Sequence, residues 1–171
     1  IGLGKTAVAD QVIGTVTVGL ADETGTSDSI SIGINEATSA TLKATAIETV
    51  NFTLSTTDTD IAEAALTVSA LNATNLTVTG ADADVGHTLS LGTLDTDTTS
   101  LDASGYKGIL TATAGAATGM TISVGGDVLH QLTGSSAADT FTVGATTGAD
   151  MLIDGNGGTD VLNITLGAGA Q

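Results

Sequence analysis

Apolar and polar residues alternate along most of this chain, in short runs separated by clusters of Asp, Gly, Asn and Ser. Within the runs, Val, Ile or Leu takes every second position and Thr or Ser often stands between them. This period predicts β-strands with one apolar and one polar face. A helical pattern is confined to Ile61–Leu66, which could form one turn. Strands are expected at Thr15–Leu20, Ser29–Ile34, Thr49–Leu54, Leu66–Ala70, Leu76–Thr79, Thr88–Leu91, Ile109–Thr113, Met120–Val124, Thr140–Val143, Met151–Ile153 and Val161–Leu166.

One pattern, apolar then small polar then apolar, returns along the chain, and the strands recur about every ten to twelve residues. Such short, regularly spaced strands fit either a β-sandwich or a stack of coils. Hairpin signals are nearly absent and the alternating apolar residues are small aliphatics, which favours coils that place like residues on like residues. The pattern is found in Leu66-Thr-Val68, Leu76-Thr-Val78, Leu89-Ser-Leu91, Ile122-Ser-Val124 and Phe141-Thr-Val143.

The sequence therefore predicts an all-β fold, a right-handed parallel β-helix or β-roll solenoid. A β-sandwich is the alternative, especially for the N-terminal part. Residues 1–60 are expected to form a less regular β segment and residues 61–171 the solenoid, with glycine–aspartate turns at 132–163. Because the chain begins at Ile1 without an initiator Met and ends in Gly-Ala-Gly-Ala-Gln171, we expect it to be part of a longer protein.

Three glycine–aspartate turns in the last third of the chain suggest a metal site. They contain Asp139, Asp150 and Asp160, and each aspartate is followed two residues later by an apolar residue. The pattern matches, imperfectly, the nonapeptide G-G-x-G-x-D-x-U-x, which forms calcium-binding coils. If successive coils bring the aspartates to one corner, their carboxylates and the turn carbonyls supply the hard oxygen ligands that Ca²⁺ takes. The alternative is ordinary Asx turns, in which Asp caps its own backbone.

Residues around these aspartates complete the predicted calcium site. Asp154, Asn156 and Gly158 lie in or next to the third turn, where Asp154 is an additional ligand or a bulge, and Asp127 follows Gly125-Gly126 in a similar turn. The predicted metal ligands are thus Asp127, Asp139, Asp150, Asp154, Asn156, Gly158 and Asp160. Weaker candidates are the acids around Gly25 (Asp22, Glu23, Asp28) and the alternate pairs Asp58/Asp60, Asp82/Asp84 and Asp95/Asp97, which are equally explained as solvated loops.

Charge narrows the function further, because 3 Lys and Arg stand against 19 Asp and Glu, for a net charge of −16. Such a chain lacks the cations that bind nucleic acid, and it repels anionic membranes. Carboxylates instead suit Ca²⁺, Mg²⁺ or Mn²⁺. There is no Cys, so neither disulfides nor thiol chemistry is available. No run of eighteen apolar residues predicts a membrane span.

Nothing in the sequence indicates an enzyme. His87 and His130 are far apart and lack a partner at metal-ligand spacing. There is no nucleophile elbow, and the many Ser and Thr residues are explained by strands. We therefore expect no catalytic activity and no organic cofactor.

The stretch Leu132–Leu162 resembles RTX repeats, and two upstream segments, Ala46–Leu54 and Thr99–Thr113, are similar to bacterial surface-layer proteins of the RTX type. The resemblance implies Ca²⁺ in the glycine-rich turns, type I secretion, folding outside the cell, and assembly of copies into a lattice. The sequence departs from the RTX repeat consensus at Ser135, Ala137 and Ala145.

These observations together predict a structural, calcium-binding segment of a bacterial surface-layer protein at the cell surface. Its expected partners are copies of itself in a lattice or filament, with cell-surface polysaccharide as a further candidate, and neither nucleic acid nor direct membrane insertion. The alternatives are a segment of a large RTX adhesin or phage tail fibre, and the secretion and folding module of an RTX exoenzyme.

Overall fold

The computed structural model describes residues 2–4, 11–18, 24–35, 37–54, 64–71, 73–80, 88–115, 118–126, 128–146 and 150–168. Within these residues every regular element is a β-strand, so none of them forms a helix that could cross a membrane. The fifteen strands are β1 (Gly2–Gly4), β2 (Gln11–Val18), β3 (Ser29–Asn35), β4 (Ala37–Ala44), β5 (Thr49–Leu54), β6 (Ala64–Leu71), β7 (Asn75–Gly80), β8 (Thr88–Thr93), β9 (Ser100–Tyr106), β10 (Ile109–Thr113), β11 (Thr121–Val124), β12 (Gln131–Thr133), β13 (Thr140–Thr146), β14 (Leu152–Asp154) and β15 (Val161–Leu166).

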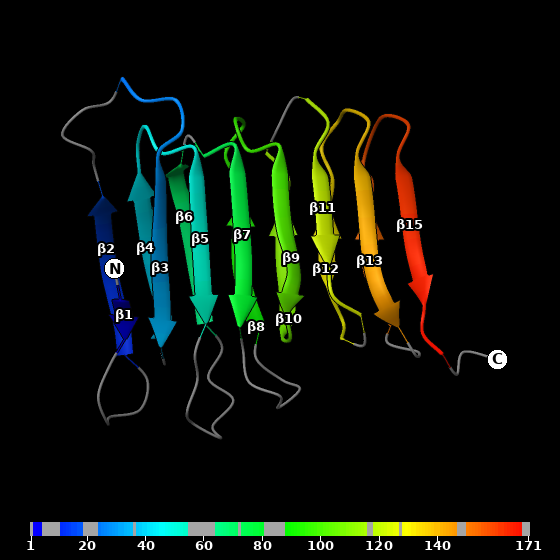
Figure 1. Cartoon of the computed structure of the whole chain (residues 1–171), viewed down its shortest axis with the longest axis horizontal. Coiled ribbons are helices and arrows are strands. Elements are labelled where there is room, and N and C mark those ends of the chain that lie inside the picture. Colours follow the sequence, from blue (N-terminus) through cyan, green and yellow to red (C-terminus); the bar gives the residue numbers. More distant parts are fainter. Residues whose placement is uncertain are drawn as a thin grey trace.

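The strands form two parallel sheets, and the chain alternates between them. Odd-numbered strands make an eight-stranded sheet in the order β1-β3-β5-β7-β9-β11-β13-β15, and even-numbered strands a seven-stranded sheet in the order β14-β12-β10-β8-β6-β4-β2. In Figure 1 the odd strands run downward in front, the even strands run upward behind, and successive coils advance to the right. This makes the coil right-handed, the hand that parallel crossovers adopt.

The predicted β-solenoid is confirmed, since every strand pair between described residues is parallel. The two halves of the chain share both sheets, because β5 pairs with β7 in one sheet and β4 pairs with β6 in the other. The predicted boundary near residue 60 falls among residues 55–63, outside the described residues. Of the predicted helical turn, residues 64–66 belong to β6 instead.

Four strands went unpredicted: β1, β4, β9 and β12. β1 and β12 have only three residues each, too few for a period to be visible. β9 carries Asp102 and Gly105, residues that are depleted in strands. β4 alternates Ala with Thr and Ser, a weak apolar signal. The spacing of ten to twelve residues is half a coil, because consecutive strands belong to opposite sheets. Thr121 pairs with Thr140 one full coil later.

The core consists of columns of like residues between the two sheets. Burial alternates along the strands, as in β5 and β10, so that every second side chain points inward. One column of the odd sheet, joined by the strand register, is buried through five coils and comprises Val50, Leu76, Leu101, Ile122 and Phe141. The three aromatic side chains, Phe52, Tyr106 and Phe141, are all buried, so the core is not made of small aliphatics alone.

Replacement of Phe141 tests this packing. Its ring is 1% exposed, and the neighbouring coils hold it on both sides in the register Ile122–Phe141–Leu162. Phe141→Ala is expected to lower the free energy of unfolding by about 3–5 kcal/mol, through lost burial and a residual cavity. Thr142→Ala, on the outward face of the same strand, is the control and should cost less than about 1 kcal/mol. Urea unfolding followed by circular dichroism measures both, and equal losses would contradict the assignment of faces.

Candidate functional site

Two of the three glycine–aspartate turns lie at one edge of the solenoid, where the even-numbered strands end and the odd-numbered strands begin. This upper edge (top of Figure 1) holds the connection 134–139 between β12 and β13 and the connection 155–160 between β14 and β15. Asp150 belongs to the connection from β13 to β14, which lies at the opposite, lower edge. The expectation that Asp139, Asp150 and Asp160 share one corner is therefore wrong for Asp150. Asp127 falls outside the described residues.

The prediction placed Asp150 with Asp139 and Asp160 because it took their spacing of ten or eleven residues as one repeat. That spacing is half a coil. Residues one coil apart share an edge, whereas residues half a coil apart lie at opposite edges. Asp139 and Asp160 are one full coil apart, because Thr140 and Val161, the residues that follow them, are register partners.

Each odd strand from β3 to β15 is preceded at the upper edge by one residue of a stack that runs from coil to coil, which we name the corner column. Its members are Asp28, Glu48, Thr74, Thr99, Met120, Asp139 and Asp160. Backbone hydrogen bonds connect this column from coil to coil. The first residue of each odd strand from β5 to β15 donates its amide hydrogen to the carbonyl of the column residue in the preceding coil. Examples are Thr49 N to Asp28 O at 3.0 Å and Val161 N to Asp139 O at 2.8 Å.

Asp139 closes its turn with its side chain. Oδ1 accepts the amide of Met120 in the preceding coil at 2.6 Å, and Oδ2 accepts the amide of Ser135 at 2.7 Å. The Ser135 hydroxyl lies 3.1 and 3.2 Å from the two oxygens. The residue is 1% exposed, so these charge-assisted bonds replace the water that a buried carboxylate loses.

The same contact recurs along the corner column. Asp160 Oδ1 accepts the amide of Asp139 at 3.0 Å, and Glu48 Oε2 accepts the amide of Asp28 at 2.8 Å. A carboxylate in one coil thus caps the amide of the column residue in the coil before it. Glu48 is not among the residues predicted from the sequence, although an acid directly before a Thr-apolar run is the signal that identifies it.

The glycine in each turn makes room for the carboxylate that folds back over it. A Cβ atom at Gly134 would lie 2.5 Å from Asp139 Oδ2, and a Cβ at Gly155 would lie 2.1 Å from Asp160 Oδ2. The glycine five residues before the aspartate is therefore required by the cap itself. At Gly158 glycine is required for a different reason. Its φ is +99°, and a Cβ there would lie 2.5 Å from the backbone of Ala137 in the preceding coil.

The last turn collects four of the predicted metal ligands. Asp154 Oδ1 accepts the amide of Asn156 at 2.9 Å, which is an Asx turn, and Asn156 has a φ of +66°. Asp154, Asn156, Gly158 and Asp160 are all exposed, in contrast to Asp139. Among the residues that the structure describes, no group of three or more His, Cys, Asp or Glu side chains is arranged to hold a metal ion.

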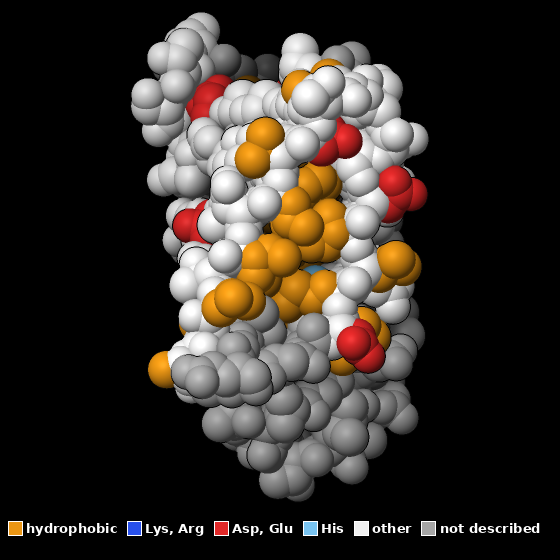
Figure 2. Space-filling model, turned by 90° about the vertical axis from the view of Figure 1, so that its right-hand side faces the viewer, with side chains coloured by type: hydrophobic (Ala, Val, Ile, Leu, Met, Phe, Trp, Pro, Cys, Tyr) orange, Lys and Arg blue, Asp and Glu red, His pale blue; other side chains and the backbone are white. Residues whose placement is uncertain are grey.

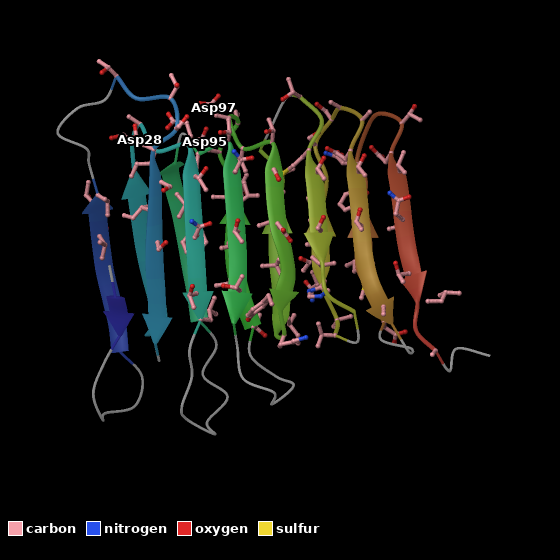
Figure 3. All side chains as sticks on the ribbon, in the orientation of Figure 1. Asp28, Asp95 and Asp97 are labelled. Atoms are coloured by element: carbon pink, nitrogen blue, oxygen red, sulfur yellow. The ribbon has the colours of Figure 1, made fainter. Side chains whose placement is uncertain are left out.

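Other acids of the upper edge do not gather into one site. Figure 3 shows Asp28, Asp95 and Asp97 there, but β5 and β7 lie between the strands that follow Asp28 and the Asp95–Asp97 turn. Asp95 Oδ1 accepts the amide of Asp97 at 3.1 Å, again an Asx turn. Asp28 Oδ2 is a buried atom without a hydrogen bond to any described residue. The pair Asp95/Asp97 is thus used by its own loop.

His130 is buried in the lower half of the core, immediately before β12. Nδ1 accepts the amide of Leu110 at 3.1 Å, so the proton of the neutral ring is on Nε2, which forms no hydrogen bond within the described residues. Burial lowers the pKa of His130, and the backbone of Gly125 opposes that shift only in part. The neutral ring is therefore a structural acceptor for a strand amide.

The chain was compared with protein-family models, with curated proteins and with solved structures, and none of the three comparisons gives a match.

Removal of the Asp139 carboxylate tests the cap. Asp139→Ala leaves the amides of Met120 and Ser135 without their acceptor, and each buried unpaired amide costs about 1–3 kcal/mol. Asp150→Ala, an exposed position at the lower edge, should stay within about 0.5 kcal/mol of the parent. Urea unfolding in EGTA measures both without metal. A loss at Asp139 no larger than at Asp150 would show that the cap does not stabilise the coil.

His130 gives the fold a pH dependence. Because its folded pKa lies below the ordinary value near 6.5, stability is complete above about pH 6.5 and falls as the pH drops toward the lowered pKa. His130→Asn keeps an acceptor for Leu110 N and removes the titration. Urea midpoints between pH 7.5 and about pH 5 should decline less in this variant than in the parent. An unchanged slope in His130→Asn would contradict the prediction.

Proposed function

We propose that this chain is a structural segment, a β-solenoid whose task is to hold its own shape within an extracellular bacterial assembly. The observation that carries the proposal is the corner column, in which carboxylates cap backbone amides from one coil to the next. In this arrangement the acids at the edge are part of the scaffold. A repeated, self-capping coil is suited to spacing or framing, which is the role expected of a surface-layer protein or a long adhesin.

The buried polar side chains support a structural role over a catalytic one. Thr98 Oγ1 donates to the carbonyl of Ala73 at 3.0 Å, and Nδ1 of His130 accepts the amide of Leu110. Ser135 and Asp139 bond to each other. All four residues are buried and bond to backbone groups or to each other, whereas a catalytic group needs an atom that a substrate can reach.

We further propose that Ca²⁺ binds in the last turn. Asp154, Asn156 and Asp160 are exposed there and offer side-chain oxygens, and Gly158 offers a carbonyl within the same turn. A net charge of −16 favours a divalent cation at such a position. Asp139 is not part of this proposed site, because both of its oxygens already accept hydrogen bonds. Few carboxylates and an exposed position correspond to weak sites of the extracellular kind, with a Kd of about 10⁻⁴–10⁻³ M.

The surface-layer assignment extends this proposal. Copies of the chain would meet in a lattice or filament at the cell surface, and calcium would reduce the repulsion between their acidic edges. Cell-surface polysaccharide is the further partner we propose. A segment of an adhesin or tail fibre, or the folding module of an exoenzyme, would use the same coil.

A calcium titration tests the metal site. At about 10 mM Ca²⁺, a site with the Kd above would raise the free energy of unfolding by about 1.4–2.7 kcal/mol relative to EGTA. The double variant Asp154→Asn, Asp160→Asn should lose this gain, whereas Asp150→Asn at the lower edge should keep it. Mg²⁺ at the same concentration controls for screening. An equal gain in all three proteins, or no gain in the parent, would refute the site.

The structural role itself is tested by hydrogen exchange in EGTA. The amides of Met120 and Asp139, which donate to column carboxylates, should exchange as slowly as the strand amides of β11 and β13. Fast exchange of these two amides would refute the self-capping scaffold, whatever the calcium result.

A further inference from the structure

The turn between β14 and β15 contains the one place in the chain where glycine directly follows asparagine, Asn156-Gly157. In such a pair the backbone nitrogen of the glycine can attack the side-chain amide of the asparagine, because no Cβ hinders its approach. Every other asparagine is followed by a residue that has a side chain, namely at Asn35, Asn51, Asn72, Asn75 and Asn163. Asn156 is therefore the asparagine most open to this reaction.

The folded turn holds the attacking nitrogen away from its target. The Gly157 amide donates to the carbonyl of Ser135 in the preceding coil at 3.2 Å, and the Asn156 amide donates to Asp154 Oδ1 at 2.9 Å. Attack requires Gly157 N to lose its proton and approach Cγ of Asn156, so its bond to Ser135 must break first. Both contacts lie within the turn or reach the preceding coil, so they do not depend on any chain that follows β15.

The bond that protects the site is the longest of its row. At 3.2 Å it lies at the upper limit for an N–H···O bond, whereas Gly134 N to Asp154 O is 2.7 Å and Val161 N to Asp139 O is 2.8 Å. Asn156 has a φ of +66°, a conformation that asparagine adopts but that still costs free energy. We therefore expect the turn to open locally while the strands on either side stay paired.

We propose that Asn156 is a site of spontaneous deamidation, and that closure of its coil controls the rate. When the turn opens, Gly157 N bonds to Cγ of Asn156. The proton of Gly157 N and the Nδ2 amino group leave together as ammonia, which gives a five-membered succinimide. Water then opens this ring. Cleavage between Gly157 N and Cγ gives aspartate, and cleavage between Gly157 N and the main-chain carbonyl carbon gives isoaspartate.

Isoaspartate prevents the turn from closing again. Its main chain runs through Cβ and Cγ, so the path from Cα of residue 156 to Gly157 N is one atom longer. The stacking leaves no room for this, because a Cβ at Gly158 would already lie 2.5 Å from the backbone of Ala137. Figure 2 views this end of the solenoid, where acidic side chains surround the hydrophobic ones. Either product adds a negative charge there, so repulsion also opposes closure.

Deamidation of the full chain in EGTA at mildly alkaline pH tests the proposal, with peptide mass spectrometry as the readout. Asn156 should react at least about tenfold faster in guanidinium chloride than in the folded protein. Asp154→Ala removes the acceptor of the Asn156 amide, and it should speed the reaction of the folded protein without changing the rate in denaturant. Asn163, which Ile164 follows, is the internal control and should stay unmodified. Equal rates for folded and unfolded parent, or equal reaction at Asn163, would overturn the proposal.

Asn156→Asp separates the added charge from the longer main chain. Hydrogen exchange compares this variant with the isoaspartate form, isolated by chromatography. The amide of Gly157 should stay protected in Asn156→Asp, which keeps the normal main chain, and should exchange fast in the isoaspartate form. Equal protection in both proteins would overturn the claim that isoaspartate keeps the turn open.

Calcium gives a separate measurement, and this part alone rests on the proposed metal site. Because that site exists only in the closed turn, Ca²⁺ at about 10 mM should slow deamidation about ten- to hundredfold relative to EGTA, for the Kd given above. The double variant Asp154→Asn, Asp160→Asn should lose this slowing. Protection by folding in EGTA without further slowing by Ca²⁺ would refute the metal site and support the deamidation site.

Discussion

In-register parallel pairing is the constraint from which the rest of this structure follows. Each strand must meet the hydrogen-bonding groups of the strand one coil earlier, so equivalent positions stack directly and a residue type suited to one coil is suited to the next. The column from Val50 to Phe141 is the result inside the solenoid. Coil length is less restricted: Thr121 and Thr140 are nineteen residues apart, whereas Val50 and Leu76 are twenty-six apart. The connections absorb the difference while the strands keep their register.

The corners pose the harder problem, because the chain must turn there and its amides leave the sheets. Asp139 solves it by accepting one amide from its own turn and one from the coil before it. The cost of burying this carboxylate is offset by three donor groups within 3.2 Å, two backbone amides and the Ser135 hydroxyl. Glu48 and Asp160, which cap the amides of Asp28 and Asp139, show that the device is distributed along the edge, toward both ends of the chain.

The fold could be predicted from the sequence because the apolar–Thr–apolar pattern is local and repeats. The site could be predicted only in part. Asp139, Asp154, Asn156, Gly158 and Asp160 do lie in turns of one edge, but Asp150 does not, because the apparent repeat was half a coil. The missing information was the number of strands per coil, which depends on weak strands such as β12. The glycines were assigned to a metal loop, whereas Gly134 and Gly155 are explained by the space that the cap needs. That need depends on contacts between coils, which no local pattern contains.

Every backbone hydrogen bond between coils runs along the solenoid axis, since the strands lie across it. A load applied between the two ends of the molecule would therefore act on these bonds directly, in the direction in which they separate. The coil at the loaded end would carry the force on one ladder at a time, so the bonds of a strand would open in succession and not all together. Such a rod yields stepwise, releasing about one coil of chain at each step while the remaining coils keep their packing. Each coil adds only about 4.8 Å to the folded rod but more than about ten times that length once it is unwound. We therefore expect the segment to lengthen coil by coil when it is pulled from its two ends.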